Sequence, residues 1–204
     1  MLKRKLLIVF VSVSLFLNFS SCSILKTFEN IGRLKFRLGT IDNLLFSGIS
    51  VNSKSRLQDF NAAEVLRLTS AVAQKKLPVS FTLNIQALNP NTGSGGGAAT
   101  DLTLKSFPWR LYIDDKETIS GDISAPIYVP GKGEATVFPL KVNLDLFRFF
   151  GDRGFESLVN LGLKLGGAKG SAMNVKLVAK PTISSPIGDI TYPRELTIVN
   201  QQYN

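Results

Sequence analysis

Few side chains in this chain could do chemistry, because its 204 residues include no histidine and a single cysteine, Cys22. The absence of histidine excludes catalytic triads with an imidazole base, histidine metal ligands and an imidazole pH switch. A lone cysteine excludes a disulfide within the chain, a cysteine-rich zinc site and an iron–sulfur cluster. Carboxylates, serines and lysines are the groups that remain for catalysis.

The carboxylates do not form the pattern that catalysis or metal binding needs. The 15 acidic residues are scattered, and none lies in a segment predicted to be buried. Asp114, Asp115 and Glu117 could offer oxygens to calcium, but the further ligands of a calcium loop are missing, so we predict a hairpin turn. The glycines at 93–97 do not open a helix, as a nucleotide-phosphate loop must. We therefore expect no enzyme activity, no catalytic residue, no metal and no cofactor.

The N-terminus has the three parts of a secretory signal. Three cationic residues at positions 3–5 precede an uncharged run of 12 residues, Leu6 to Leu17, and small polar residues then lead to Cys22. A helix that spans a bilayer needs about 20 apolar residues, so the run is too short for a transmembrane anchor. Its place and flanks instead predict a cleaved export signal.

The stretch from Phe19 to Cys22 resembles the end of a bacterial lipoprotein signal, in which small residues precede a cysteine that becomes the new N-terminus. The resemblance implies that residues 1–21 are removed and that Cys22 carries a thioether-linked diacylglycerol. Two or three acyl chains anchor stably, because each buried methylene contributes about 0.8 kcal/mol. We expect an outer-membrane lipoprotein that faces the periplasm, with residues 22–33 as a tether. The alternative is an ordinary secretory signal with a spare thiol.

The net charge indicates partners only weakly. Removal of residues 1–21 takes three cations and no acid from the formal charge of +9, which leaves +6. A nucleic-acid-binding protein needs a basic patch with interleaved aromatic residues or a recognition motif, and neither occurs. We expect no nucleic-acid partner, and a solvated basic surface that favours anionic lipid headgroups.

Two-residue alternation of apolar and polar residues dominates the mature chain. The clearest examples are 79–87 and 138–146, where one set of side chains would face a core. Pro139 inside the second run predicts an edge strand or a bulge. Many short strands with turn signals between them predict a mostly β fold. The expected domain covers residues 34–199 as an immunoglobulin- or fibronectin-like antiparallel β-sandwich with one or two accessory helices.

Two segments change to a helical period. Residues 59–75 predict an amphipathic helix, with Asn61 and Glu64 at capping-box spacing. Its predicted buried face consists of Ala62, Val65, Leu66, Thr69, Val72 and Ala73. From Phe147 the pattern is helical again, with interruptions at Gly151 and Gly154.

Residues 77–146 carry an ordered set of features. A strand runs into Asn89-Pro90-Asn91, a strand pair surrounds residues 109–122, and Val129-Pro130-Gly131-Lys132-Gly133 leads into another strand. This order resembles the group 2 late-embryogenesis-abundant family, also called the WHy domain. The resemblance implies a β-sandwich linked to desiccation and stress responses, without a general catalytic site. The glycine-rich insert at 92–99 and the glycine-interrupted helix depart from the family pattern.

One apolar segment exceeds what the alternating strands need. Its members are Phe147, Phe149, Phe150, Phe155 and Leu158. The favoured interpretation is a cap on one end of the core, because apolar stripes usually mark burial. The alternatives are a lid over a lipid-binding cleft or a patch that docks on a membrane or a partner.

These observations predict a lipid-anchored protein of the bacterial envelope. We expect a noncatalytic binding or structural module linked to stress protection, held to the membrane through Cys22 and able to contact an envelope protein. The alternative function is a carrier of lipid or another hydrophobic ligand.

Overall fold

The computed structural model of the chain describes residues 34–51, 53–93, 99–165, 173–185 and 188–203. The signal at 1–21, the lipidation site Cys22 and the tether at 22–33 lie outside the described residues, as does most of the glycine-rich insert.

The described strands form three antiparallel sheets of four strands each. The first contains β1 (Lys35–Phe46), β2 (Ile49–Ser50), β3 (Pro78–Leu88) and β8 (Ala135–Asp145), in the order β2-β1-β3-β8. The second contains β4 (Leu102–Ser106), β7 (Ile127–Val129), β10 (Thr182–Ser185) and β11 (Gly188–Thr191), in the order β11-β10-β4-β7. The third contains β5 (Trp109–Ile113), β6 (Lys116–Gly121), β9 (Met173–Ala179) and β12 (Leu196–Tyr203), in the order β12-β9-β5-β6.

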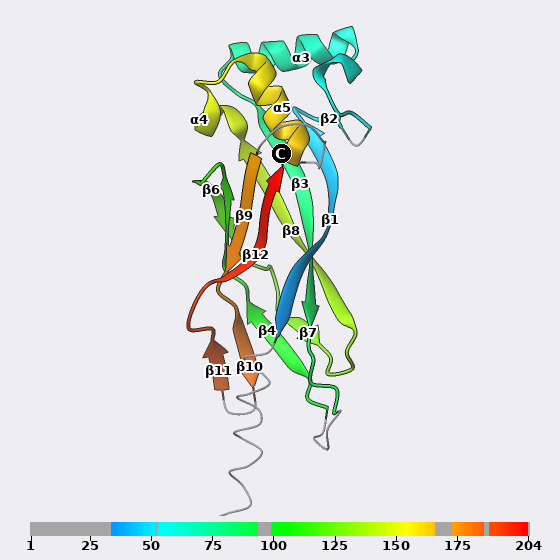
Figure 1. Cartoon of the computed structure of the whole chain (residues 1–204), viewed down its shortest axis with the longest axis vertical. Helices are drawn as coiled ribbons and strands as arrows, with labels where there is room; N and C mark the ends of the chain where they lie inside the picture. The colour runs from blue at the N-terminus through cyan, green and yellow to red at the C-terminus, as the bar shows by residue number, and fades with distance from the viewer. Residues whose placement is uncertain (1–33, 52, 94–98, 166–172, 186–187, 204) are drawn as a thin grey trace, which may run out of the picture.

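The two sheets of short strands follow one another along the molecule and together face the long first sheet (Figure 1). β4 continues into β5 through Phe107 and Pro108, and β9 continues into β10 through Lys180 and Pro181. The Lys180 N–H donates to the Pro108 carbonyl at 2.9 Å, which ties the two connections together. Prolines at both junctions explain the break, since proline cannot donate to a ladder.

The core lies between these two layers. Along β3 the odd-numbered residues from Val79 to Ala87 are buried, and the even-numbered ones are not. The Phe107 ring lies 5.1 Å from that of Phe36 and 5.2 Å from that of Phe138, so the junction of the short sheets packs on the first sheet. The predicted mostly β, antiparallel sandwich with accessory helices is confirmed. Pro139 lies in β8, which is an edge strand of its sheet, as expected.

The helices gather at one end of the sandwich (Figure 1). A short 3-10 helix, η1 (Leu57–Asp59), and α3 (Ala62–Ala73) precede β3. α4 (Leu146–Phe150) and α5 (Phe155–Leu165) follow β8. The expected capping box begins α3: the Glu64 N–H donates to the Asn61 side chain and the Asn61 N–H to the Glu64 carboxylate, both at 2.9 Å.

The predicted buried face of α3 is wrong. Leu68, which the prediction omitted, is fully buried, whereas Leu66 is 68% exposed. Ala62, Thr69 and Ala73 are also exposed, and only Val65 and Val72 pack partly against the core. The helix lies across the end of the sandwich (Figure 1), so only a narrow line of its surface meets the core. Periodicity finds a wide apolar stripe but cannot say how much of it has something to pack on.

Candidate functional site

The described acidic side chains mostly hold the fold together. Asp145 accepts hydrogen bonds from the N–H groups of Leu77 at 2.7 Å and Phe147 at 3.0 Å, and so joins β3 to the start of α4. Asp101 accepts from the Gly131 N–H at 2.8 Å and from the Tyr128 hydroxyl. The bond from the Gly131 N–H contributes most, and the bond from Tyr128 adds to it, so that the pKa of Asp101 lies below its ordinary value. Both carboxylates therefore link segments that are distant in the sequence.

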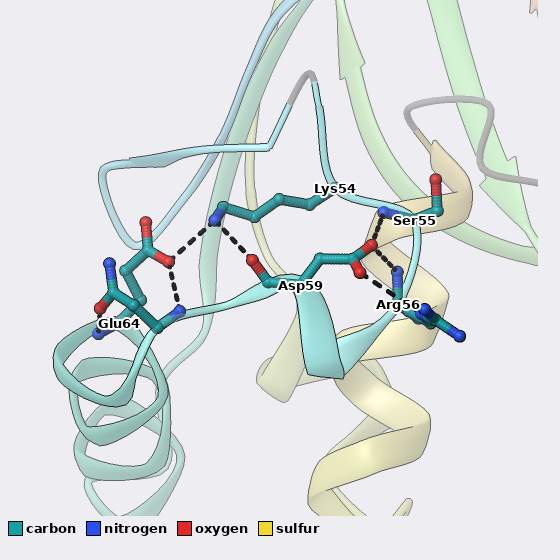
Figure 2. Close-up of polar contacts among 6 residues, drawn as sticks. Lys54, Ser55, Arg56, Asp59 and Glu64 are labelled. Carbon is teal, nitrogen blue, oxygen red and sulfur yellow. Dashed lines mark hydrogen bonds and ion pairs between the residues drawn. The ribbon is translucent and has the colours of Figure 1, made fainter.

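The densest polar cluster braces the loop before α3 (Figure 2). The Lys54 ammonium donates to the Glu64 carboxylate at 2.8 Å and to the Asp59 carbonyl at 3.0 Å, and it also lies 4.8 Å from the centre of the Phe60 ring. The bond from Lys54, followed by that from the Asn61 N–H, lowers the pKa of Glu64. Each charge has its partner, so the cluster is a structural brace around a helix N-terminus.

The acidic turn between β5 and β6 is a hairpin, as predicted. Asp114 and Asp115 have positive φ values of 48° and 61°, which suit a tight turn between twisted strands. Arg153 donates to Asp114 at 2.8 Å, and Tyr112 donates to Glu117 at 2.9 Å. Within the described ranges, no group of three His, Cys, Asp or Glu side chains could hold a metal ion.

The Asn89-Pro90-Asn91 motif is part of the frame of the sandwich. Asn89 is fully buried, and its amide donates to the carbonyls of Thr100 at 2.8 Å and Val129 at 3.3 Å. Its side-chain oxygen accepts from the Asn91 N–H at 3.1 Å. This one side chain therefore joins the end of β3 to the segments that enter β4 and leave β7. The motif therefore has a structural role in the sandwich.

The aromatic segment caps the end of the core. Phe150 and Leu158 are buried, whereas Phe147, Phe149 and Phe155 are half-buried and pack on the core. Two cations lie over the buried Phe150 ring: Arg153 is 4.7 Å from the ring centre and Lys116 is 5.7 Å from it. Lys164, on α5, is buried, and this burial lowers the pKa of its amine. The arrangement is that of core packing with a cationic rim.

One small space lies between the sheets among the described residues. Leu38 and Leu83 of the first sheet and Leu111 and Leu177 of the third are among the side chains around a space of about 20 Å³. That volume admits roughly one water molecule, whereas pockets for small molecules measure about 300–1,000 Å³. This space offers no room for an acyl chain, so it does not favour the carrier function.

A larger hollow lies on the outer face of the first sheet. It has a volume of about 540 Å³ and is lined by Lys35, Phe36, Arg37, Gln86, Leu88, Gly133 and Ala135. We call it the outer-face groove. Two cations border a floor that is mostly apolar, so its chemistry suits a ligand with an anionic and an apolar part. We take it as the candidate site.

Sequence reasoning did not find this groove. Alternation correctly separates Phe36 from its neighbours Lys35 and Arg37 on β1. The pairing that completes the groove is long-range: Lys35 lies opposite Leu88, and Leu88 lies opposite Ala135. The signal that could have pointed to it is the pair of cations on one strand face with no acid at the neighbouring positions.

Comparison with known proteins identifies no family. No protein-family model matches the chain, and no curated protein matches it either. The helices among the described residues are all too short or too polar to cross a membrane. What the structure itself defines is the class: a mostly β, antiparallel sandwich with helices at one end.

Three solved structures are similar at low identity. A putative late embryogenesis abundant protein is 15% identical, with 94% of this chain and 83% of that chain covered and a TM-score of 0.39. A protein from Arabidopsis thaliana is 14% identical, with 83% of both chains covered and a TM-score of 0.36. A protein from Archaeoglobus fulgidus is 10% identical, with 81% of this chain and 95% of that chain covered and a TM-score of 0.35. Scores at this level support no conclusion about function.

Proposed function

We propose that the chain is a noncatalytic β-sandwich module held at a membrane of the bacterial envelope by acyl chains on Cys22. The observation that carries the proposal is the position of the sole cysteine, which stands just beyond a short apolar run with the charge pattern of an export signal and follows two small residues, Ser20 and Ser21. A part in envelope stress protection belongs to the proposal and rests on the resemblance of residues 77–146.

The geometry of the domain supports an anchor at this end of the chain. β1 starts at Lys35, opposite Leu88 at the far end of β3, whereas α3 leads into the near end of β3 at Pro78. The tether therefore joins the sandwich at the end opposite the helices (Figure 1). Residues 22–33, fully extended at about 3.4 Å each, would reach roughly 40 Å. The sandwich could then touch the membrane or stand clear of it.

The use of the polar groups supports a noncatalytic role. Asp59, Glu64, Asp101 and Asp145 accept hydrogen bonds from backbone N–H groups, which fixes them in place. Arg110 donates to Glu195 at 2.6 and 2.7 Å, an ion pair that bridges β5 and the segment before β12. Groups committed to such contacts stabilise the fold.

The experiment is cell fractionation of the native chain and a Cys22→Ala variant in a Gram-negative host. We expect the native protein in the membrane fraction, resistant to salt extraction and released by detergent. The variant has no thiol for acylation and should lose this detergent-dependent behaviour. Ser21→Ala is the matched control, because it changes the neighbouring residue and keeps the thiol. A native protein that is as soluble as the variant would overturn the proposal.

A further inference from the structure

We infer that the outer-face groove is a second membrane contact, which seats the headgroup of an anionic phospholipid. This inference rests on the proposed function, since the anchor brings the groove to the lipid surface. It commits to a lipid bilayer as the occupant. It also places the sandwich with the start of β1 against the membrane and the helices away from it.

The charge of the groove is free to act on a ligand. Lys35 and Arg37 are both exposed, and no described carboxylate forms an ion pair with either. The Arg37 Nε donates to the Gln86 side chain at 2.6 Å, which holds the guanidinium over the sheet. Its terminal N–H groups can then bind a phosphate, which arginine does with two parallel hydrogen bonds. Glu134 lies beside the groove in the sequence and does not line it.

The apolar part of the groove fits the region below a headgroup. Leu88 is half-buried and Ala135 is exposed, whereas the Phe36 ring turns to the core and reaches the ring of Phe107 at 5.1 Å. Val137, which lies opposite Gln86 in the next row of the sheet, is 56% exposed. Cations beside exposed apolar side chains are the arrangement by which proteins bind the interface of an anionic membrane.

The position of the groove agrees with this contact. Lys35 is both a lining residue and the first residue of β1, so the groove lies where the tether joins the domain. The 12 residues from Cys22 to Arg33 tie it to the lipid anchor and raise its effective concentration at the surface. A weak headgroup contact can therefore be occupied in the anchored protein.

The test uses a mature chain of residues 23–204, which contains every described element and lacks the anchor. Vesicles of phosphatidylglycerol and of phosphatidylcholine are the probes, and binding is measured by sedimentation. We expect binding to phosphatidylglycerol vesicles that weakens as salt rises from 50 to 300 mM, as screening requires, and little binding to phosphatidylcholine. The double variant Lys35→Gln/Arg37→Gln should bind about 25-fold more weakly, at roughly five-fold for each cation.

The matched control removes two cations elsewhere. Lys141, on the outer face of β8, and Lys76, after α3, are exposed and form no ion pair with a described residue. Lys76→Gln/Lys141→Gln has the same net charge as the groove variant, so it should keep most of the binding. Equal losses in the two variants would show a general charge effect and overturn the inference.

A second measurement locates the contact. The chain of residues 23–204 has no cysteine, so Ala135→Cys and Gln74→Cys each accept one environment-sensitive dye. The dye at the groove should shift to the blue on phosphatidylglycerol vesicles, and the dye after α3 should not. A shift only at position 74, or vesicle binding without a shift at 135, would overturn the inference. Because this chain lacks Cys22, such a failure is distinct from failure of the anchor, which fractionation tests.

Discussion

At the scale of single residues, one buried polar side chain can join segments that are distant in the chain. Asn89 shows this most clearly, since it is fully buried and joins three segments through its two donors and its oxygen. Asparagine and proline chemistry predicts a turn at this place. The sequence does not show that the amide reaches Thr100 and Val129, because those contacts depend on how distant strands come together.

Replacement of Asn89 by leucine should therefore be costly. Asn89→Leu removes the donors to two buried carbonyls, and unmet buried groups cost about 1–3 kcal/mol each. We expect the free energy of unfolding to fall by about 3 kcal/mol, measured by urea denaturation of the mature chain. Asn84→Leu, on the outer face of the same strand, is the control and should cost about 1 kcal/mol or less. Equal effects of the two changes would contradict the framing role of Asn89.

Gly162 is needed for a close approach of α5 to the first sheet. A Cβ at this position would lie 1.5 Å from the Cζ of Phe46, whose side chain is fully buried, so the ring or the helix must shift. Overpacking of this kind costs about 1–3 kcal/mol. We expect Gly162→Ala to lower the thermal midpoint clearly.

Two variants make this prediction specific. Gly154→Ala places a Cβ where nothing lies within 4 Å, so it should leave the midpoint nearly unchanged. Phe46→Leu combined with Gly162→Ala should lose less stability than the sum of the single changes, because the smaller side chain relieves the clash. Strict additivity would show that the two residues do not compete for space.

At the scale of elements, the sequence predicts the existence of helices and strands better than their contacts. The segments 79–87 and 138–145 are strands with the predicted faces, whereas Leu146, predicted as strand, begins α4. α3 begins at its predicted capping box. The predicted buried face of α3 is wrong, because burial depends on which neighbouring elements the helix contacts. The break between α4 and α5 contains Gly151 and Gly154, where the sequence pattern predicts an interruption.

The observed phase of α3 can be tested directly. Leu68→Ala removes a fully buried side chain and should cost about 2–5 kcal/mol. Leu66→Ala changes a side chain that is 68% exposed and should cost about 0.5 kcal/mol or less. Urea denaturation of both variants decides between the faces. A larger loss at position 66 would restore the face predicted from periodicity.

At the scale of the whole molecule, the sandwich could be predicted because the alternation along each strand already shows which side chains face the core. The division of one layer into two sheets at Pro108 and Pro181 could not, since a proline breaks a ladder only where strand pairing places it. The outer-face groove could not be predicted from the sequence either. Its two sides come from strands some fifty residues apart along the chain, and only the register of β1, β3 and β8 unites them.

The account depends on one covalent modification that we propose at the N-terminus. An intact mass measurement of the full-length protein, expressed in a Gram-negative host and extracted from its membranes with detergent, tests it most directly. We predict a polypeptide that begins at Cys22 and carries the added mass of a diacylglyceryl group, with or without a third acyl chain. An unmodified Cys22, or a chain that retains residues 1–21, would contradict the account.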